Sequence, residues 1–351
     1  MAKVSSIIRI TDMKIIHFSN DGNCVTRRPS WRVQMSFSLL QGIVSAPVLF
    51  FGLGVLAGIV RSNLSVPRSI SQFLSIFLMM AIGLKGGMAL RAEGALSADF
   101  AATLGFGILF GLLQPVIGYG LLKFTTSLER ATAAATAAHY GSVSVVTFAT
   151  AVSYLDLHHV AYAGYIVAVV AAMEAPAIIS GLMLARDQER PHKFSHLLAE
   201  TATNGAVLLL IGALVIGTVV GSAKMTSVSA FFIDPFQGIL CLFLLDMGLT
   251  VSRNLKHIRQ FSPALLAFGL YMPLIGAALG MGASHLIGLD VGTTFLFTVL
   301  CASASYIAVP AAMRVALPQA QQAIYIPMSL AVTFPFNILI GIPLYSYLTS
   351  Q

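Results

Sequence analysis

Long runs of apolar residues dominate the chain, and short polar stretches separate them. Ten such runs lie near residues 37–60, 69–90, 100–123, 131–153, 160–184, 205–222, 232–250, 263–287, 291–313 and 323–348. Most of them reach the roughly 20 helical residues needed to cross the hydrocarbon core of a bilayer. Because lipid offers backbone groups no hydrogen-bond partners, spanning segments are helices or closed barrels. No run alternates as a barrel strand does, so the pattern predicts an all-α polytopic membrane protein with ten transmembrane helices.

Composition agrees with this fold class and excludes several functions. The chain is 57% hydrophobic and only 9% charged, whereas soluble domains carry roughly 25% charged residues. The net charge of +7 resides in short loops and one tail, where it sets membrane topology, so we expect no nucleic-acid partner. Three scattered cysteines are too few for a disulfide framework or a zinc site. Without a nucleotide-binding loop, an HExxH pair or a nucleophile elbow, we expect neither an enzyme nor a cofactor.

Related short motifs recur in the two halves of the chain. Residues 82–87 (IGLKGG) in the second run correspond to 247–252 (MGLTVS) in the seventh, and Tyr140 in the fourth corresponds to Tyr306 in the ninth. Five runs per half is an odd number, so the second half must enter the membrane from the opposite side. This predicts two inverted five-helix repeats. The expected organisation is a tail (1–34), a first repeat (35–186), a cytoplasmic connector (187–204) and a second repeat (205–351).

The loop charges and the charges of the N-terminal tail predict opposite orientations of the chain in the membrane. Most loop lysines and arginines lie on the side opposite the termini, so the positive-inside rule places both termini outside the cytoplasm. Residues 1–34 hold six bases and favour the reverse. This conflict suggests that Met35 is the biological start and that the tail is a mis-called extension. A short cytoplasmic arm is the alternative.

The fourth and ninth runs contain helix-weakening residues at their centres. Gly and Ser weaken the fourth, and Pro310 weakens the ninth. If each helix breaks there, the N-termini of the half-helices favour an anion. Freed carbonyl and hydroxyl oxygens suit a hard cation such as sodium. The alternative is that small residues only allow close helix packing, but two symmetry-related breaks favour a discontinuous-helix binding site.

Three charged residues fall inside the apolar runs, namely Lys85, Glu174 and Asp246. A charge at the bilayer centre costs roughly 2.5–3.5 kcal/mol on insertion scales, so such residues pair or take part in function. Lys85 and Asp246 lie on related segments and are expected to approach one another, either as a packing ion pair or in ion coupling. Glu174 precedes Pro176 and is a candidate ligand of a cation; a position near an aqueous cavity is the alternative.

Together these motifs resemble the sodium-dependent bicarbonate transporter family of bacterial permeases. The resemblance covers residues from about 38 to 349 and rests on motifs in both halves: 82–91, Gly141 to Ser144 with Thr147, 173–177, Asp234 with Pro235, Met247 with Gly248, 303–310, and Arg314 with Pro318. It implies sodium-coupled uptake of bicarbonate by an elevator-type movement, a core and a gate domain, a homotrimer and a location in the bacterial inner membrane. The substrate-binding residues it implies are Gly141, Ser142, Ser144, Thr147, Ser303 and Ser305.

The chain departs from the cyanobacterial members of this family at three places. Tyr306 replaces an acidic residue after the serines, Lys85 replaces a threonine, and the central connector is short. The first two changes make the site more positive by two charges, which favours altered sodium binding or another anion. The short connector makes control by a PII-like regulator doubtful. Two alternatives therefore stay open: an ion-coupled transporter of another small organic anion, and a non-transporting membrane sensor.

Overall fold

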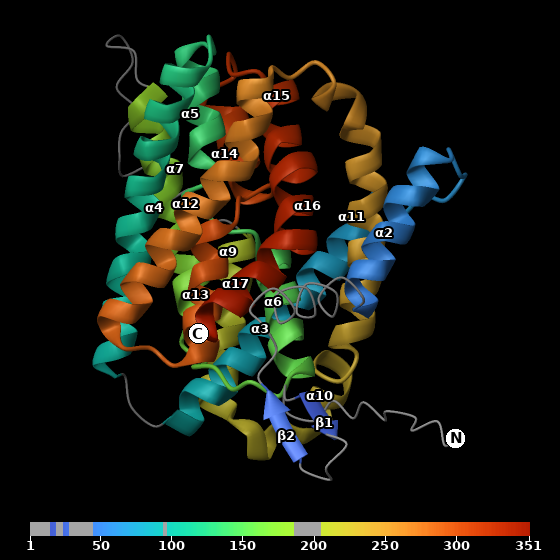
Figure 1. Ribbon diagram of the computed structural model, residues 1–351, viewed down its shortest axis with the longest axis vertical. Coiled ribbons are helices and arrows are strands. Elements are labelled where there is room, and N and C mark those ends of the chain that lie inside the picture. Colours follow the sequence, from blue (N-terminus) through green and yellow to red (C-terminus); the bar gives the residue numbers. More distant parts are fainter. Residues whose placement is uncertain (1–14, 19–23, 28–44, 94–96, 186–204) are drawn as a thin grey trace.

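The computed structural model describes residues 15–18, 24–27, 45–93, 97–185 and 205–351, and almost all of them are helical (Figure 1). The helices before the connector are α2 (Ala46–Ile59), α3 (Arg68–Glu93), α4 (Ala98–Thr125), α5 (Arg130–Ala138), α6 (Val145–Leu157) and α7 (Ile166–Ala185). Most begin as their sequences dictate. Pro47 occupies the first turn of α2, and the Ser97 hydroxyl accepts from the Phe100 amide at the start of α4.

The second half is divided in a similar way. Its elements are α9 (Gly205–Val220), η1 (Ser222–Lys224), α10 (Thr226–Phe232), α11 (Phe236–Ile258), α12 (Pro263–Ile287), α13 (Val291–Ala302), α14 (Ala308–Ala316), α15 (Gln322–Pro327), the π-helical η2 (Met328–Thr333), α16 (Phe334–Phe336), the π-helical η3 (Asn337–Gly341) and α17 (Ile342–Thr349). The elements from α15 to α17 form one continuous helical rod, which we call the π-helical rod. Its π-helical turns follow from the prolines and polar residues that interrupt this apolar run.

Helices occupy each of the ten apolar runs. Six helical segments of the described chain are long and apolar enough to cross a membrane, and four shorter apolar helices accompany them. The protein is therefore a multi-pass membrane protein. The inverted relation of its halves stays a prediction. The connector 187–204 and most of the tail lie outside the described residues.

Two short strands are an exception to the expected all-α class. Strands β1 (Ile15–Phe18) and β2 (Cys24–Arg27) pair antiparallel, with Ile15 opposite Arg27. They lie in the tail, apart from every apolar run, and they are the only strands within the described ranges. The membrane body is helical throughout, as the sequence predicts.

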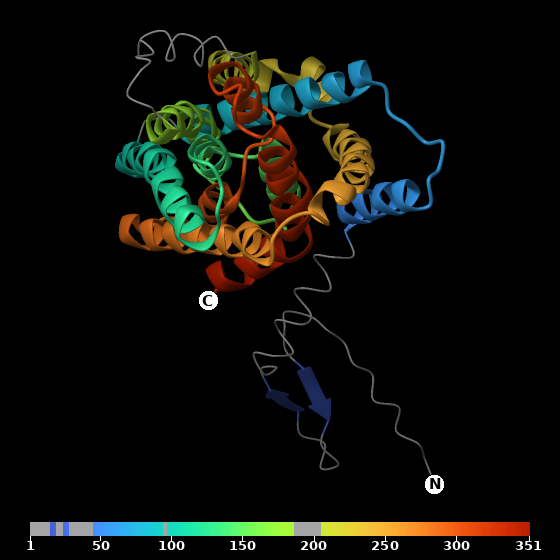
Figure 2. The same ribbon diagram turned by 90° about the horizontal axis from the view of Figure 1, so that it is seen from above.

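The helices fall into two groups. Helices α2, α3, α9, α10 and α11 pack mainly on one another, and the remaining helices form a second group. Figures 1 and 2 show α2 beside α11 at one edge of the body, with α4 at the opposite edge. We call these the α2–α11 group and the α4–α7 group. Few contacts join them compared with the contacts inside each.

Glycines set the close packing inside the α2–α11 group. A Cβ added at Gly248 would lie 2.3 Å from the Phe51 carbonyl oxygen, and one at Gly87 would lie 2.1 Å from the Leu214 carbonyl oxygen. Helix backbones approach this closely only where side chains are absent. The motifs at 82–87 and 247–252 therefore hold helix pairs together, and their glycines do not line the candidate site described below.

Candidate functional site

The fourth apolar run is interrupted at its centre, as predicted. Helix α5 ends at Ala138 and α6 starts at Val145, with extended backbone at Ser144 between them. The Ser144 hydroxyl accepts from the Thr147 amide at 3.1 Å and from the Thr147 hydroxyl at 2.9 Å. This N-cap replaces the helical hydrogen bonds that the break removes. The amides of Val145 and Val146 keep no acceptor within their own helix.

The ninth run is interrupted too, but Pro310 is not where the helix breaks. Helix α13 ends at Ala302 and α14 begins at Ala308, so Pro310 lies in the first turn of α14. A helix leaves the first four amides without intrahelical acceptors, so proline costs little there. The break itself occupies residues 303–307. There the Ser305 hydroxyl faces the Val309 amide at 3.5 Å.

The two interruptions cross and are hydrogen-bonded to each other. The Ser144 amide donates to the Ser303 hydroxyl at 3.0 Å, and the Ser305 amide donates to the His139 carbonyl at 2.8 Å. The Ser303 hydroxyl in turn donates to the Leu300 carbonyl at 2.9 Å. Residues 159 positions apart in sequence thus share one buried point. The structure brings together the serines from both halves that the sequence singled out, and we call this point the crossing.

The π-helical rod supports the crossing through residues that sequence reasoning missed. The side-chain amide of Asn337 donates to the Ala302 carbonyl at 2.9 Å. This bond gives a partner to a carbonyl at the C-terminal end of α13, where the helix provides none. The Tyr345 hydroxyl donates to the Asn337 side-chain oxygen at 3.1 Å. On the other break, the Tyr140 and Thr333 hydroxyls are 2.7 Å apart. A lone amide within an apolar run was the available signal for Asn337.

Glu174 faces a small cavity beside the crossing. The cavity has a free volume of about 10 Å³, and its lining includes Glu174, Ser144, Ser305 and Tyr306. That is roughly the room for one water-sized occupant. The Glu174 side chain is 4% exposed, and its Oε2 has no hydrogen-bond partner among the described residues. A buried carboxyl oxygen without a partner is costly, so this oxygen is available to a ligand that enters the cavity.

Further unpartnered polar atoms surround the crossing. The Ser142 hydroxyl and the His139 Nε2 have no partner in the described part of the chain, and neither does the side-chain amide of Gln114. Gln114 precedes Pro115, against whose ring Gly141 packs. Sequence reasoning did not select Gln114, although it is the only amide side chain in the run 100–123. Native proteins rarely leave several buried polar atoms unpaired in one region unless a ligand or water occupies it.

The close approach of the break in the fourth run to α4 requires glycine at position 141, because no larger residue fits there. A Cβ there would lie 2.5 Å from the Pro115 Cδ and 2.6 Å from the Gly111 carbonyl oxygen. We expect Gly141→Ala to destabilise the protein by about 1–3 kcal/mol, as overpacking does, and to lower its apparent unfolding midpoint in circular dichroism. Gly120→Ala is the control, since a Cβ at Gly120 meets nothing within 4 Å. Equal midpoints for the two variants would contradict the close-approach argument.

Asp246 lies opposite the crossing on the α2–α11 group. Its side chain is 5% exposed on α11 and interacts with Ser71 of α3. It is within electrostatic range of the Tyr306 hydroxyl. The Tyr306 hydroxyl also interacts with the Ser144 side chain at the crossing. A second buried carboxylate thus faces the crossing from across the interface between the groups.

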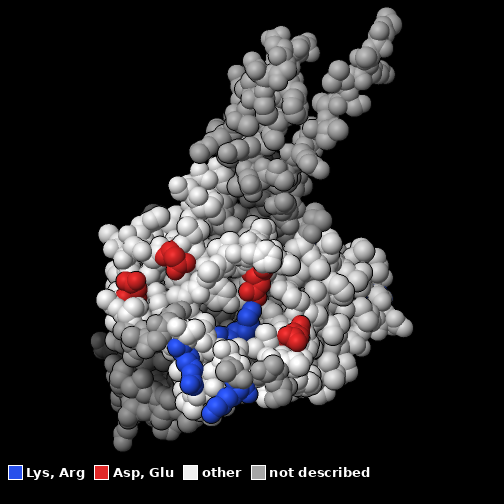
Figure 3. All heavy atoms as spheres, turned by 90° about the horizontal axis from the view of Figure 1, so that it is seen from below, with Lys and Arg blue, Asp and Glu red and all other residues white. Residues whose placement is uncertain are grey.

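The predicted approach of Lys85 to Asp246 is wrong. The Lys85 ammonium is 2.6 Å from Asp156 Oδ2 and 5.5 Å from the centre of the Phe236 ring. Phe236 begins α11, ten residues before Asp246, which is about 15 Å along a helix. Lys85 therefore lies near one end of the body. Figure 3 shows an end view in which charged side chains are few and a basic side chain touches an acidic one in a hollow.

Two interrupted helices that cross inside a multi-pass helical body define a membrane protein of the transporter class. The family model of the Na+-dependent bicarbonate transporter superfamily matches residues 46–350, and the chain belongs to this superfamily. The resemblance inferred from the motifs is thereby confirmed. A search of curated proteins finds no match to the chain.

Proposed function

We propose that the protein is a secondary active transporter that couples sodium entry to bicarbonate uptake, with the crossing as its binding site. The observation that carries this proposal is the meeting of two broken helices beside the unpartnered Glu174 carboxylate. Superfamily membership supports the substrate class. The helix ends supply positive dipoles for the anion, and the carboxylate with nearby hydroxyls supplies oxygens for the cation.

The sodium ion would bind in the small cavity. Glu174 contributes a negative charge, and the Ser144 and Ser305 hydroxyls line the same space. Hard cations prefer such oxygen ligands. Tyr306 occupies the position where cyanobacterial relatives carry an acid. Glu174, and Asp246 across the interface, supply the negative charge in its place.

Bicarbonate would bind at the α6 N-terminus. The amides of Val145 and Val146 face away from any intrahelical acceptor, and Ser142 and Gln114 offer unpaired polar atoms nearby. A free volume of about 10 Å³ has no room for an anion with four non-hydrogen atoms. Anion binding therefore requires the α2–α11 group, whose Met79 lines the cavity, to move away from the crossing. This requirement supports alternating access by an elevator-type movement of one group against the other.

Two polar contacts join the helix groups near the Lys85 end of the body. Lys85 of α3 pairs with Asp156 of α6, and the Ser153 hydroxyl of α6 donates to the Gln237 side-chain oxygen of α11 at 2.6 Å. Both contacts must break if α6 slides along α3 and α11. Lys85 and Asp156 side chains are 23% and 34% exposed, so the pair contributes at most about 1 kcal/mol.

Removing this ion pair is expected to change transport without destroying it. We expect Lys85→Ala and Asp156→Ala each to alter the uptake rate by up to about five-fold, the equivalent of about 1 kcal/mol. The exchanged pair Lys85→Asp with Asp156→Lys should return toward the wild-type rate. Lys256→Ala, at an exposed lysine on α11, is the control. An exchanged pair no better than the single variants would argue against a bridging role.

The decisive test is uptake of labelled bicarbonate into proteoliposomes containing the full chain. We expect uptake that requires an inward sodium gradient and that a potassium gradient does not replace. Uptake equal to that of empty vesicles under both gradients would refute the proposed function. An excess of small organic anions, added as competitors, separates bicarbonate from the alternative substrate class.

The setting of the protein is proposed on the same basis. The motif resemblance implies the inner membrane of a bacterium, and loop charges favour termini outside the cytoplasm. The homotrimer implied by the family stays a prediction. The connector on which a PII-like regulator would act lies outside the described residues.

A further inference from the structure

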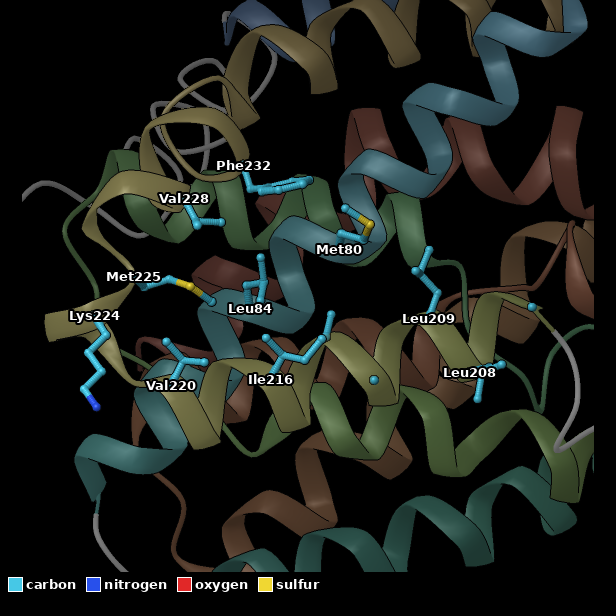
Figure 4. Close-up of a pocket in the computed structure, with 13 residues that line it drawn as sticks. Met80, Leu84, Leu208, Leu209, Ile216, Val220, Lys224, Met225, Val228 and Phe232 are labelled. Atoms are coloured by element: carbon cyan, nitrogen blue, oxygen red, sulfur yellow. The ribbon is translucent and has the colours of Figure 1, made fainter.

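A deep apolar groove lies on the α2–α11 group, away from the crossing. It has a volume of about 550 Å³ and runs between α3, α9 and the η1–α10 segment. Figure 4 shows Met80 and Leu84 of α3 facing Ile216 and Val220 of α9, with Phe232 on the third side. Sites for small molecules occupy roughly 300–1,000 Å³, so the groove has the capacity of a ligand site.

The groove is open outward and closed at its floor. Leu84, Ala213 and Met225 form a buried floor at 5%, 6% and 3% exposure. On the rim, Leu208 and Ile216 of α9 are 64% and 53% exposed. Because α3 is long and apolar enough to span a membrane and α9 beside it is apolar too, these exposed side chains are suited to contact with acyl chains. An apolar groove of this kind accepts hydrocarbon from the bilayer.

The positive charge of Lys224 distinguishes this groove from an ordinary apolar groove between helices. Among the described residues, Lys224 in η1 is the only charged residue that lines it, and Figure 4 shows its ammonium at one end, pointing outward. No acceptor for this ammonium is found in the described part of the chain. Arg91 lies nearby but is occupied, since its guanidinium donates to the Thr218 and Val219 carbonyls at the end of α9. The groove end is therefore positive, with no acidic lining residue.

We propose that this groove is a binding site for an anionic phospholipid of the bilayer. One acyl chain would lie along the floor between α3 and α9, and the phosphate would contact Lys224. A neutral lipid satisfies the apolar walls equally well, so the lysine gives the preference for negative headgroups. The bound chain would join α10 to the α3–α9 pair and thereby stabilise the α2–α11 group. This site is separate from the crossing and does not depend on the transported substrate.

Glycines around the groove allow a direct test with the full chain. A Cβ at Gly212 of α9, which lines the groove, meets nothing within 4 Å, and the same holds for Gly52 of α2, which does not line it. Gly212→Trp therefore fills the groove without a backbone collision, and Gly52→Trp is the matched control. Lipid retained by the purified protein is measured by native mass spectrometry after addition of phosphatidylglycerol or phosphatidylcholine. Thermal unfolding is measured in parallel.

We expect the wild-type protein to retain phosphatidylglycerol over phosphatidylcholine and to unfold at a higher temperature with it. Lys224→Ala should weaken retention of phosphatidylglycerol about five-fold while leaving phosphatidylcholine unchanged. Gly212→Trp should reduce retention of both lipids, and Gly52→Trp neither. Equal retention of the two lipids by the wild type, or unchanged retention in Lys224→Ala, would overturn the proposal. Loss of an oligomer in Gly212→Trp with unchanged lipid retention would instead identify a second copy as the occupant.

Discussion

Replacing Glu174 by glutamine is expected to weaken the response of uptake to sodium strongly while leaving the fold intact. The substitution keeps the shape of the side chain and removes its negative charge from the cavity beside Ser144 and Ser305. Even outer-shell partners of metal ligands are worth about 10–100-fold in metal affinity, so a direct anionic ligand should be worth at least as much. We expect the sodium concentration for half-maximal uptake to rise by at least about ten-fold. The measurement is bicarbonate uptake in proteoliposomes across a sodium titration.

The control for this experiment is Glu129→Gln, at an exposed glutamate before α5. This variant should titrate with sodium as the wild type does. An unchanged sodium dependence in Glu174→Gln would contradict the assignment of the cavity to the cation. A decrease in uptake with unchanged sodium dependence would instead assign Glu174 to the anion or to movement. Asp246→Asn, made in parallel, tests the second carboxylate that faces the crossing from α11.

Local composition was sufficient to predict that the fourth and ninth apolar runs are interrupted. Gly141 and the serines around it cannot sustain a helix as leucines do, and their counterparts at 303–305 share this property. Apolar run lengths were sufficient to predict the membrane class. These features depend on residues close together in sequence, so a single sequence contains the necessary information.

Long-range partners could not be predicted in this way. Lys85 pairs with Asp156, which is 71 residues away, and nothing in the spacing of the two distinguishes Asp156 from Asp246. The error arose because repeat symmetry relates positions but does not say which side chains touch. Pro310 shows a different limit, since a proline is a helix breaker in mid-helix and tolerated in a first turn. Whether Pro310 lies in mid-helix or in a first turn depends on where the preceding helix ends, and α13 ends at Ala302 with Ser303 as its C-cap.

Gln114→Leu should lower uptake strongly without loss of stability, and this combination separates a ligand from a structural residue. The side chain is completely buried on α4, and neither its oxygen nor its nitrogen has a partner in the described chain. A buried, unpaired polar group costs about 1–3 kcal/mol, so leucine should raise the unfolding midpoint of the substrate-free protein or leave it unchanged. A hydrogen bond to a charged ligand contributes about 1.5–3 kcal/mol. Its loss should lower bicarbonate uptake at limiting substrate by about 10–100-fold.

For a ligand residue, the unfolding midpoint and the uptake change in opposite directions, or the midpoint stays unchanged. If Gln114 served only packing, leucine would lower both the midpoint and the uptake, because a well-made contact would be lost. If the amide were paired only with water, the midpoint would change and uptake would not. Gln260→Leu, at an exposed turn after α11, controls for added hydrophobicity. Retained stability together with lost uptake would therefore assign a ligand role to Gln114. In that case α4 contributes to the anion site, although it is neither of the two broken helices.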